Sequence, residues 1–155
     1  MIKELLEKQI VFDTTLDFLS FLAEWEISER TIPFLTEILA NINLSLNNPK
    51  ASNHLKDLAS TWKELMPPDG QDHFQIKEIT DDTAYVEIHL HCPLRGTGKV
   101  DSCYKFMNYD RILMEKVGGS LTVLESQSNS GKNFCKLAIR QIGVSTADLV
   151  PAHKK

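Results

Sequence analysis

Apolar side chains recur every three or four positions through the first part of the chain, which is the spacing of amphipathic helices. Runs rich in turn-forming residues interrupt this pattern at Asn47-Asn48-Pro49 and again at Met66-Pro67-Pro68-Asp69-Gly70. We therefore expect a helical region over residues 1–66. The pattern predicts its helices at residues 2–25, 28–44 and 51–65.

From residue 73 onward the period of the pattern changes to two, as in a strand with one buried face. In the clearest case Val86 and Ile88 fall on one face, whereas Glu87 falls on the other. Pro93 ends this strand, because proline cannot donate to a sheet ladder. The pattern predicts strands at residues 74–80, 84–92, 121–126 and 134–139, a helix at 101–117 and a hairpin turn at 129–132.

This order of elements predicts a single α+β domain over residues 1–155. N-terminal helices are followed by a β-β-α-β-β unit, whose four strands form an antiparallel sheet covered by the helices. We expect the helical part at residues 1–66, the sheet-containing part at 73–140 and a tail at 143–155. A chain of 155 residues can bury a core without disulfides or metals.

Composition narrows the classes of function. Hydrophobic residues make up 42% of the chain and charged residues 25%, which is typical of a soluble globular protein. The net charge of −4 does not favour nucleic-acid binding, which needs clustered lysine and arginine. Charged residues interrupt residues 1–25 too often for a signal peptide or a membrane span. We therefore expect a cytoplasmic protein, and its odd number of cysteines does not predict disulfides.

Three cysteines in the sheet-containing part are the first candidates for chemistry. Cys92 and Cys135 fall on the core-facing side of their predicted strands, and Cys103 falls in the first turn of the predicted helix. Their thiolates could hold zinc or an iron–sulfur cluster with a fourth ligand from elsewhere in the chain. His91 is a candidate for that ligand, but it would need a bulge in the strand to reach the side of Cys92. Their spacings, C-x10-C and C-x31-C, match no structural zinc pattern, so buried packing is favoured. A redox-sensing Cys103 is a further alternative, because a helix N-terminus lowers the pKa of a thiol.

His89 and His91 lie with Glu87 on the strand face opposite Cys92. Two histidines at this spacing could share a metal, or one could act as a general base. No nucleophile is visible near them in the sequence. A polar face toward solvent or a dimer partner is therefore the favoured interpretation.

The loop Leu94–Lys99 joins a strand to a helix, a position at which proteins bind phosphate groups. A phosphate-binding loop needs an upstream glycine and a Ser or Thr after its Gly-Lys pair, where this chain has Pro93 and Val100. The nucleotide-binding interpretation therefore fails. Arg95 and Lys99, together with the amides at the helix start, still predict a weaker anion site.

Leu121–Ser126 and Ser130–Ile139 form a predicted hairpin, in which a glycine turn precedes a cysteine and an apolar strand. This hairpin resembles the end of the 4-vinyl reductase domain, a small-molecule-binding module that shares its fold with small subunits of the TRAPP vesicle-tethering complex. His91-Cys92-Pro93-Leu94 and Cys103 resemble cysteine positions of that family and of relatives described as aminothiazoline-carboxylate hydrolases. The resemblance covers residues 74–140. It implies a cytoplasmic sensor or regulatory domain for a small apolar ligand, often dimeric and in some cases metal-binding, without implying reductase activity.

The sequence leaves three hypotheses about function open, and the lack of a complete catalytic motif favours binding over catalysis. The first is a sensory or regulatory module for a small apolar or anionic ligand. The second is a small metal-dependent hydrolase or redox protein, and the third is a structural homodimer joined through its N-terminal helices. The residues expected to contact a ligand are Cys92, Arg95, Lys99, Cys103 and Met107, and those expected to bind a metal are Cys92, Cys103, Cys135 and His91.

Overall fold

The computed structural model describes residues 31–68 and 70–155. The helix expected at residues 2–25 and the helix start expected at Ser28 lie outside the described residues. The helices are α3 (Thr31–Asn47), α4 (Leu55–Glu64), α5 (Val100–Phe106), α6 (Asn108–Val117) and the short α7 (Gln127–Ser130), with 3-10 turns η1 (Gln71–His73) and η2 (Ala152–Lys154). The strands are β1 (Phe74–Ile79), β2 (Ala84–Ile88), β3 (Gly119–Glu125) and β4 (Cys135–Gln141).

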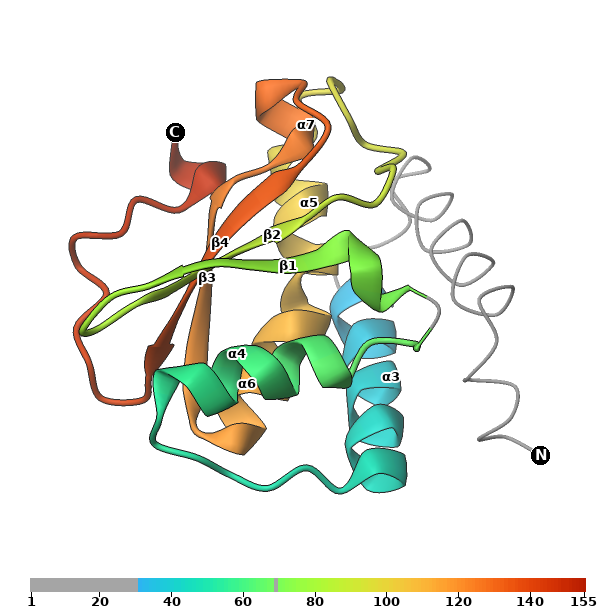
Figure 1. Cartoon of the computed structure of the whole chain (residues 1–155). Helices are drawn as coiled ribbons and strands as arrows, with labels where there is room; N and C mark the ends of the chain where they lie inside the picture. The colour runs from blue at the N-terminus through green and yellow to red at the C-terminus, as the bar shows by residue number, and fades with distance from the viewer. Residues whose placement is uncertain (1–30, 69) are drawn as a thin grey trace.

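The strands form one antiparallel sheet in the order β1-β2-β4-β3 (Figure 1). β1 pairs with β2 and β3 pairs with β4 as chain neighbours, and β4 lies between β2 and β3. Helices α3 and α4 precede all four strands, and α5 and α6 connect β2 to β3. The predicted α+β class and the β-β-α-β-β order are therefore confirmed.

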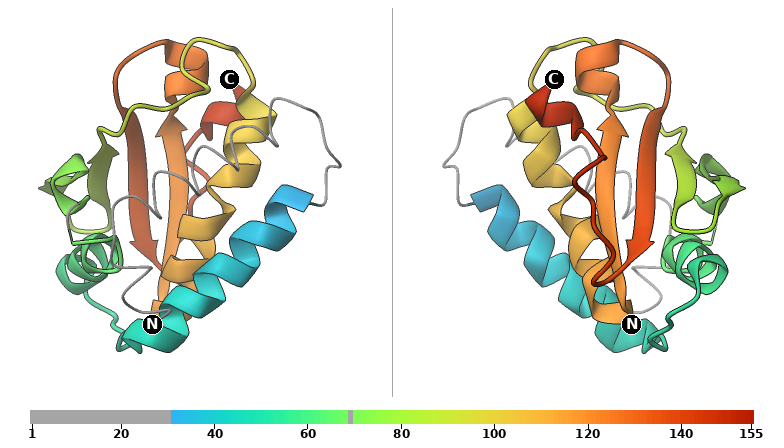
Figure 2. Two further views of the ribbon diagram at one scale, coloured as in Figure 1. Left: turned by 90° about the vertical axis from the view of Figure 1, so that its right-hand side faces the viewer. Right: turned by 90° about the vertical axis from the view of Figure 1, so that its left-hand side faces the viewer.

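Two helices cover the same face of this sheet. α4 packs against β1, β2 and β4, and α6 packs against β3. On its other side α6 contacts α3 (Figure 2). Val86, Leu137 and Val123 are cross-strand neighbours on the covered face, so alternate residues of three strands enter one core. The largest fully buried apolar side chains of this core are Leu58, Trp62, Val86, Leu113, Met114, Val117, Leu137 and Ile139.

The helix expected at residues 101–117 is divided into α5 and α6, with Met107 between them. Asn108, the first residue of α6, donates from its side chain to the Pro33 carbonyl and to Thr36 Oγ1 of α3, at 3.3 and 3.2 Å. These contacts join elements that are far apart in the sequence. The local apolar pattern does not contain them, and it therefore predicted one continuous helix.

Glycines end α6 and α7. At Gly118 φ is 100°, and an added Cβ would lie 2.6 Å from the Ser52 carbonyl oxygen, so a side chain is excluded there. The turn expected at residues 129–132 is instead α7, which is followed by Gly131 in a left-handed conformation. Ser126 and Asn129 form a capping box at its start, which a plain hairpin turn would lack.

Arg140 of β4 holds the C-terminal tail. Only 4% of this residue is exposed, and its guanidinium donates to both carboxylate oxygens of Asp148, at 2.6 and 2.8 Å. It also donates to Thr83 Oγ1 at 2.8 Å and to the Ser145 carbonyl. The hydrogen bond from Arg140 lowers the pKa of Asp148. These contacts fasten the segment after β4 to the sheet.

Replacing Arg140 by methionine is expected to release this segment, because methionine retains an apolar stem but donates no hydrogen bond. We expect chymotrypsin to cleave after Leu149 at least about tenfold faster in this variant, because local opening exposes the bond. Limited proteolysis followed by mass spectrometry measures the rate. Lys132→Met is the matched control, since it removes an exposed lysine that pairs with Glu125. Equal cleavage rates in the two variants would show that Arg140 does not hold the segment after β4 against the sheet.

Candidate functional site

Gln127 of α7 fixes the loop that follows β2. The residue is 1% exposed, and its Nε2 donates to the Leu90 carbonyl at 2.7 Å. Its Oε1 accepts from Arg95 Nε at 2.7 Å and from the Cys92 amide at 3.4 Å. Its backbone carbonyl accepts from the Gly96 amide at 2.9 Å. The loop is therefore bound by both the side chain and the backbone of one buried residue.

This binding explains why β2 ends at Ile88, whereas the alternation predicted a strand as far as Cys92. The backbone groups of Leu90 and Cys92 bond to Gln127 instead of to a neighbouring strand. The apolar pattern of the sequence does not indicate Gln127. The signal that could have found it is the capping pattern of Ser126 and Asn129 directly after β3, which indicates a helix start.

A second apolar cluster lies beside the main core, and α3, the loop after β2 and α5 supply its side chains. Met107 packs against both clusters. Several members retain exposed area, so the cluster presents apolar surface next to solvent. Its buried members are Ile32, Leu94 and Cys103, and its partly buried members are Leu35, Leu39, Cys92, Phe106 and Met107.

The structure brings most of the predicted ligand residues to one place. Cys92, Cys103 and Met107 all belong to the second cluster. Arg95 lies beside it, since the Arg95 amide donates to the Cys92 carbonyl at 3.0 Å. Lys99 is exposed at the residue before α5 and is not a member of the cluster.

Burial raises the pKa of all three thiols. It raises the pKa of Cys103 to about 11 and that of Cys135 to about 12. Burial also raises the pKa of Cys92, while the amides of Leu94 and Arg95 and the charge of Arg95 act in the opposite direction. The thiols are therefore protonated at neutral pH and are weak nucleophiles. The expectation that the helix start would lower the pKa of Cys103 is wrong, because burial outweighs it.

The residues predicted as metal ligands do not form a metal centre in the part of the chain that the structure describes. No three His, Cys, Asp or Glu side chains there are grouped so that they could hold a metal ion. Cys135 belongs to the main core, whereas Cys92 and Cys103 belong to the second cluster and His91 is exposed. β2 ends at Ile88, so Cys92 does not lie on the strand face that it was expected to share with Cys135. Besides burial, the charges of Cys103 and Cys92 still contribute to raising the pKa of Cys135.

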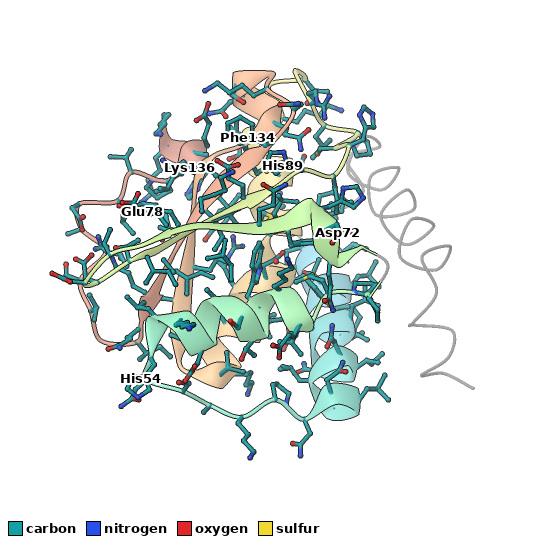
Figure 3. All side chains as sticks on the ribbon, in the orientation of Figure 1. His54, Asp72, Glu78, His89, Phe134 and Lys136 are labelled. Atoms are coloured by element: carbon teal, nitrogen blue, oxygen red, sulfur yellow. The ribbon has the colours of Figure 1, made fainter. Side chains whose placement is uncertain are left out.

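Glu87 and His89 lie on the sheet face opposite the helices. Glu87 Oε2 and His89 Nε2 are 2.8 Å apart. The His89 ring stacks on Phe134 with 5.5 Å between ring centroids, and Lys132 Nζ lies 5.6 Å from the Phe134 centroid (Figure 3). The described side-chain partners of His89 are thus a carboxylate and an aromatic ring on the polar face of the sheet, and the general-base interpretation stays a prediction.

α6 carries a buried carboxyl group that the apolar pattern did not indicate. Asp110 is 7% exposed, and its Oδ1 accepts a hydrogen bond from Trp62 Nε1 at 2.8 Å. Burial raises the pKa of Asp110 to about 6, although the Trp62 hydrogen bond acts to lower it. Beside it, Asn43 Nδ2 donates to the Tyr109 hydroxyl at 2.5 Å. These contacts tie α3, α4 and α6 together, so we assign them to stability.

Comparison with protein-family models found no match, and neither did comparison with curated proteins or with solved structures. The resemblance to the 4-vinyl reductase domain stays a prediction from the sequence. Among the described residues, the helices are too short or too polar to cross a membrane. The fold and site define an α+β domain whose sheet face is covered by helices and whose β2–α5 loop borders a separate apolar cluster.

Proposed function

We propose that this protein is a cytoplasmic sensory or regulatory module, which binds a small apolar ligand with an anionic group at the second cluster. The observation that carries the proposal is the position of that cluster. It is apolar and partly exposed, it touches the main core through Met107, and it lies beside the guanidinium-bearing residue Arg95. Ligand sites commonly combine apolar walls with a few polar groups that fix the orientation of the ligand.

The apolar part of the ligand would contact the partly buried side chains of the cluster. Leu35 and Leu39 come from α3 and Phe106 comes from α5, while the buried Leu94 and Cys103 support them. Each square ångström of apolar surface removed from water contributes about 25 cal/mol. A ligand that covers these side chains would therefore gain free energy without disturbing the main core.

The anionic group would lie near Cys92. Burial raises the pKa of this thiol, whereas the amides of Leu94 and Arg95 and the charge of Arg95 act to lower it, so these groups would attract an anion placed beside them. Gln127 holds Arg95 through Nε, which fixes the direction of the guanidinium. A carboxylate or sulfonate placed there would meet a positive charge that is already oriented.

Binding of 8-anilinonaphthalene-1-sulfonate tests this proposal, because the probe joins an aromatic body to one sulfonate. We expect one saturable site for the probe in the native protein. Its Kd should be about 10 to 100 µM, which is within the affinity that a ligand of this size can reach. Leu39→Gln should weaken binding about fivefold through lost apolar contact. Arg95→Gln should weaken it at least about tenfold through the lost charge. Fluorescence titration gives both affinities.

Two controls match these variants. Ile38→Gln changes the residue next to Leu39, which is 39% exposed and outside the cluster, and should leave the affinity unchanged. Lys99→Gln removes a nearby exposed charge and should have a smaller effect than Arg95→Gln. Near-UV circular dichroism confirms that each variant is native, since the probe also binds partly folded states. Unchanged binding by both Leu39→Gln and Arg95→Gln would refute the proposal.

A further inference from the structure

β1 is an edge strand of the sheet. It pairs with β2 on one side, and no described element pairs with it on the other (Figure 1). The opposite edge differs, because η2 packs against β3 and Lys155 Nζ bonds to the Leu124 carbonyl there, at 2.6 Å. An open edge presents backbone N–H and C=O groups that can pair with another strand.

β1 carries exposed isoleucines on one face of the sheet and charged side chains on the other. Ile76 and Ile79 are opposite Val86 and Ala84 of β2, so they point to the helix-covered face, yet they are 37% and 42% exposed. Lys77 lies at the point where the β1–β2 register shifts, and its Nζ is 3.7 Å from Glu87 on the other face.

The remaining charged residue is Glu78, which is exposed (Figure 3) and lies opposite Tyr85 of β2. Tyr85 is on the same face as Glu87. Lys77 and Glu78 therefore share the face that the helices do not cover, and the two isoleucines share the other.

We propose that β1 pairs antiparallel with β1 of a second copy of this chain, with Lys77 opposite the partner's Glu78 and Ile76 opposite the partner's Ile79. The register is symmetric, so each pair occurs twice about the two-fold axis. Opposite charges then face each other on one side of the joined sheet, and exposed isoleucines cover each other on the opposite side. Both kinds of cross-strand pair stabilise a sheet.

The charges of β1 also select the partner. A lysine and a register shift on an edge strand normally oppose pairing with unrelated strands. A second copy in this register supplies a glutamate for each lysine. This interface differs from the one expected from the sequence, which placed a dimer at the N-terminal helices.

A charge exchange tests the register. Lys77→Glu and Glu78→Lys each place like charges opposite one another twice, so each should raise the dimer Kd about 10- to 30-fold. The double variant Lys77→Glu/Glu78→Lys restores both opposite-charge pairs and should return the Kd to within about threefold of the wild type. Sedimentation equilibrium over a concentration series measures these constants, and far-UV circular dichroism checks that the variants are folded.

Ile38→Gln is the control, since Ile38 is an exposed apolar residue on α3 and should not affect the Kd. A wild-type protein that stays monomeric throughout the series would overturn the proposal. If the single charge changes leave the dimer Kd unchanged, or if Ile38→Gln raises it, the dimer interface lies elsewhere. Either result would also overturn the proposal. Single variants that weaken the dimer without rescue by the double variant would rule out this register.

Discussion

Lowering the pH from about 8 to about 4 is expected to stabilise the wild-type protein by on the order of 3 kcal/mol relative to an Asp110→Asn variant. The cause is the buried carboxyl group of Asp110, whose folded-state pKa of about 6 lies above the ordinary value of 3.8. Chemical unfolding at a series of pH values measures the difference.

The direction follows from proton binding. Below the ordinary pKa, Asp110 is protonated in both states, and its burial as a neutral acid carries no charge penalty. Between that pKa and about 6 the unfolded chain loses its proton while the folded chain retains it, so stability falls as the pH rises. A raised folded-state pKa thus contributes stability at low pH that is lost as the pH rises through about 6. A shift of about two pKa units gives the stated magnitude.

The comparison with Asp110→Asn is needed because other carboxyl groups change the pH dependence of stability in the opposite direction. Arg140 lowers the pKa of Asp148, and this contribution is lost at low pH. Asparagine at position 110 retains an oxygen that can accept from Trp62 Nε1 but does not titrate. The exposed turn residue Asp81 provides a control, and Asp81→Asn should keep the wild-type pH profile. Parallel profiles for wild type and Asp110→Asn would show that Asp110 is not the group responsible.

Replacing Gln127 by methionine is expected to destabilise the protein by about 3 kcal/mol, because it leaves several polar partners without a hydrogen bond. Methionine has a similar length, so the change removes the amide without opening a large cavity. The groups affected are the Leu90 carbonyl, the Cys92 amide and Arg95 Nε. Urea unfolding measures the loss of stability.

The same variant should loosen the loop beside the second cluster. We expect faster hydrogen exchange at the Gly96 amide, which donates to the Gln127 carbonyl, and weaker probe binding. Gln75→Met on β1 is the control, since the Gln75 side chain accepts a hydrogen bond only from the exposed Lys77 among the described contacts, and the change should alter stability by less than about 0.5 kcal/mol. A similar effect of the two substitutions would show that the contacts of Gln127 are not what holds the loop.

Local periodicity in the sequence predicted α3, α4 and the four strands of the described part of the chain, but not the division of residues 101–117 into α5 and α6 or the short helix α7. The apolar spacing predicted a helix at residues 51–65, and the structure has α4 there, with Leu55, Leu58 and Trp62 buried. The alternation at Val86 and Ile88 predicted the inward face of β2. These features depend on neighbours in the chain, because a side chain's direction repeats with the period of its own helix or strand.

The candidate site could be predicted only in part. The sequence predicts that Cys92, Cys103 and Met107 contact one ligand, and the second cluster contains all three. The alternation that predicts a strand as far as Cys92 also predicts that Cys92 and Cys135 share the core-facing side of the sheet, whereas β2 ends at Ile88. The ending of β2 depends on Gln127, which comes from a distant part of the chain, and no local period contains that information.

Only the tertiary structure decided how these elements meet. The hairpin predicted around residues 129–132 indicated that β3 would pair with β4, but the sequence did not specify that β4 would be the strand beside β2. The same holds for the contact between Asp110 and Trp62 and for that between Gln127 and Arg95. Each depends on packing between segments that are far apart in the chain, and such packing has no sequence period.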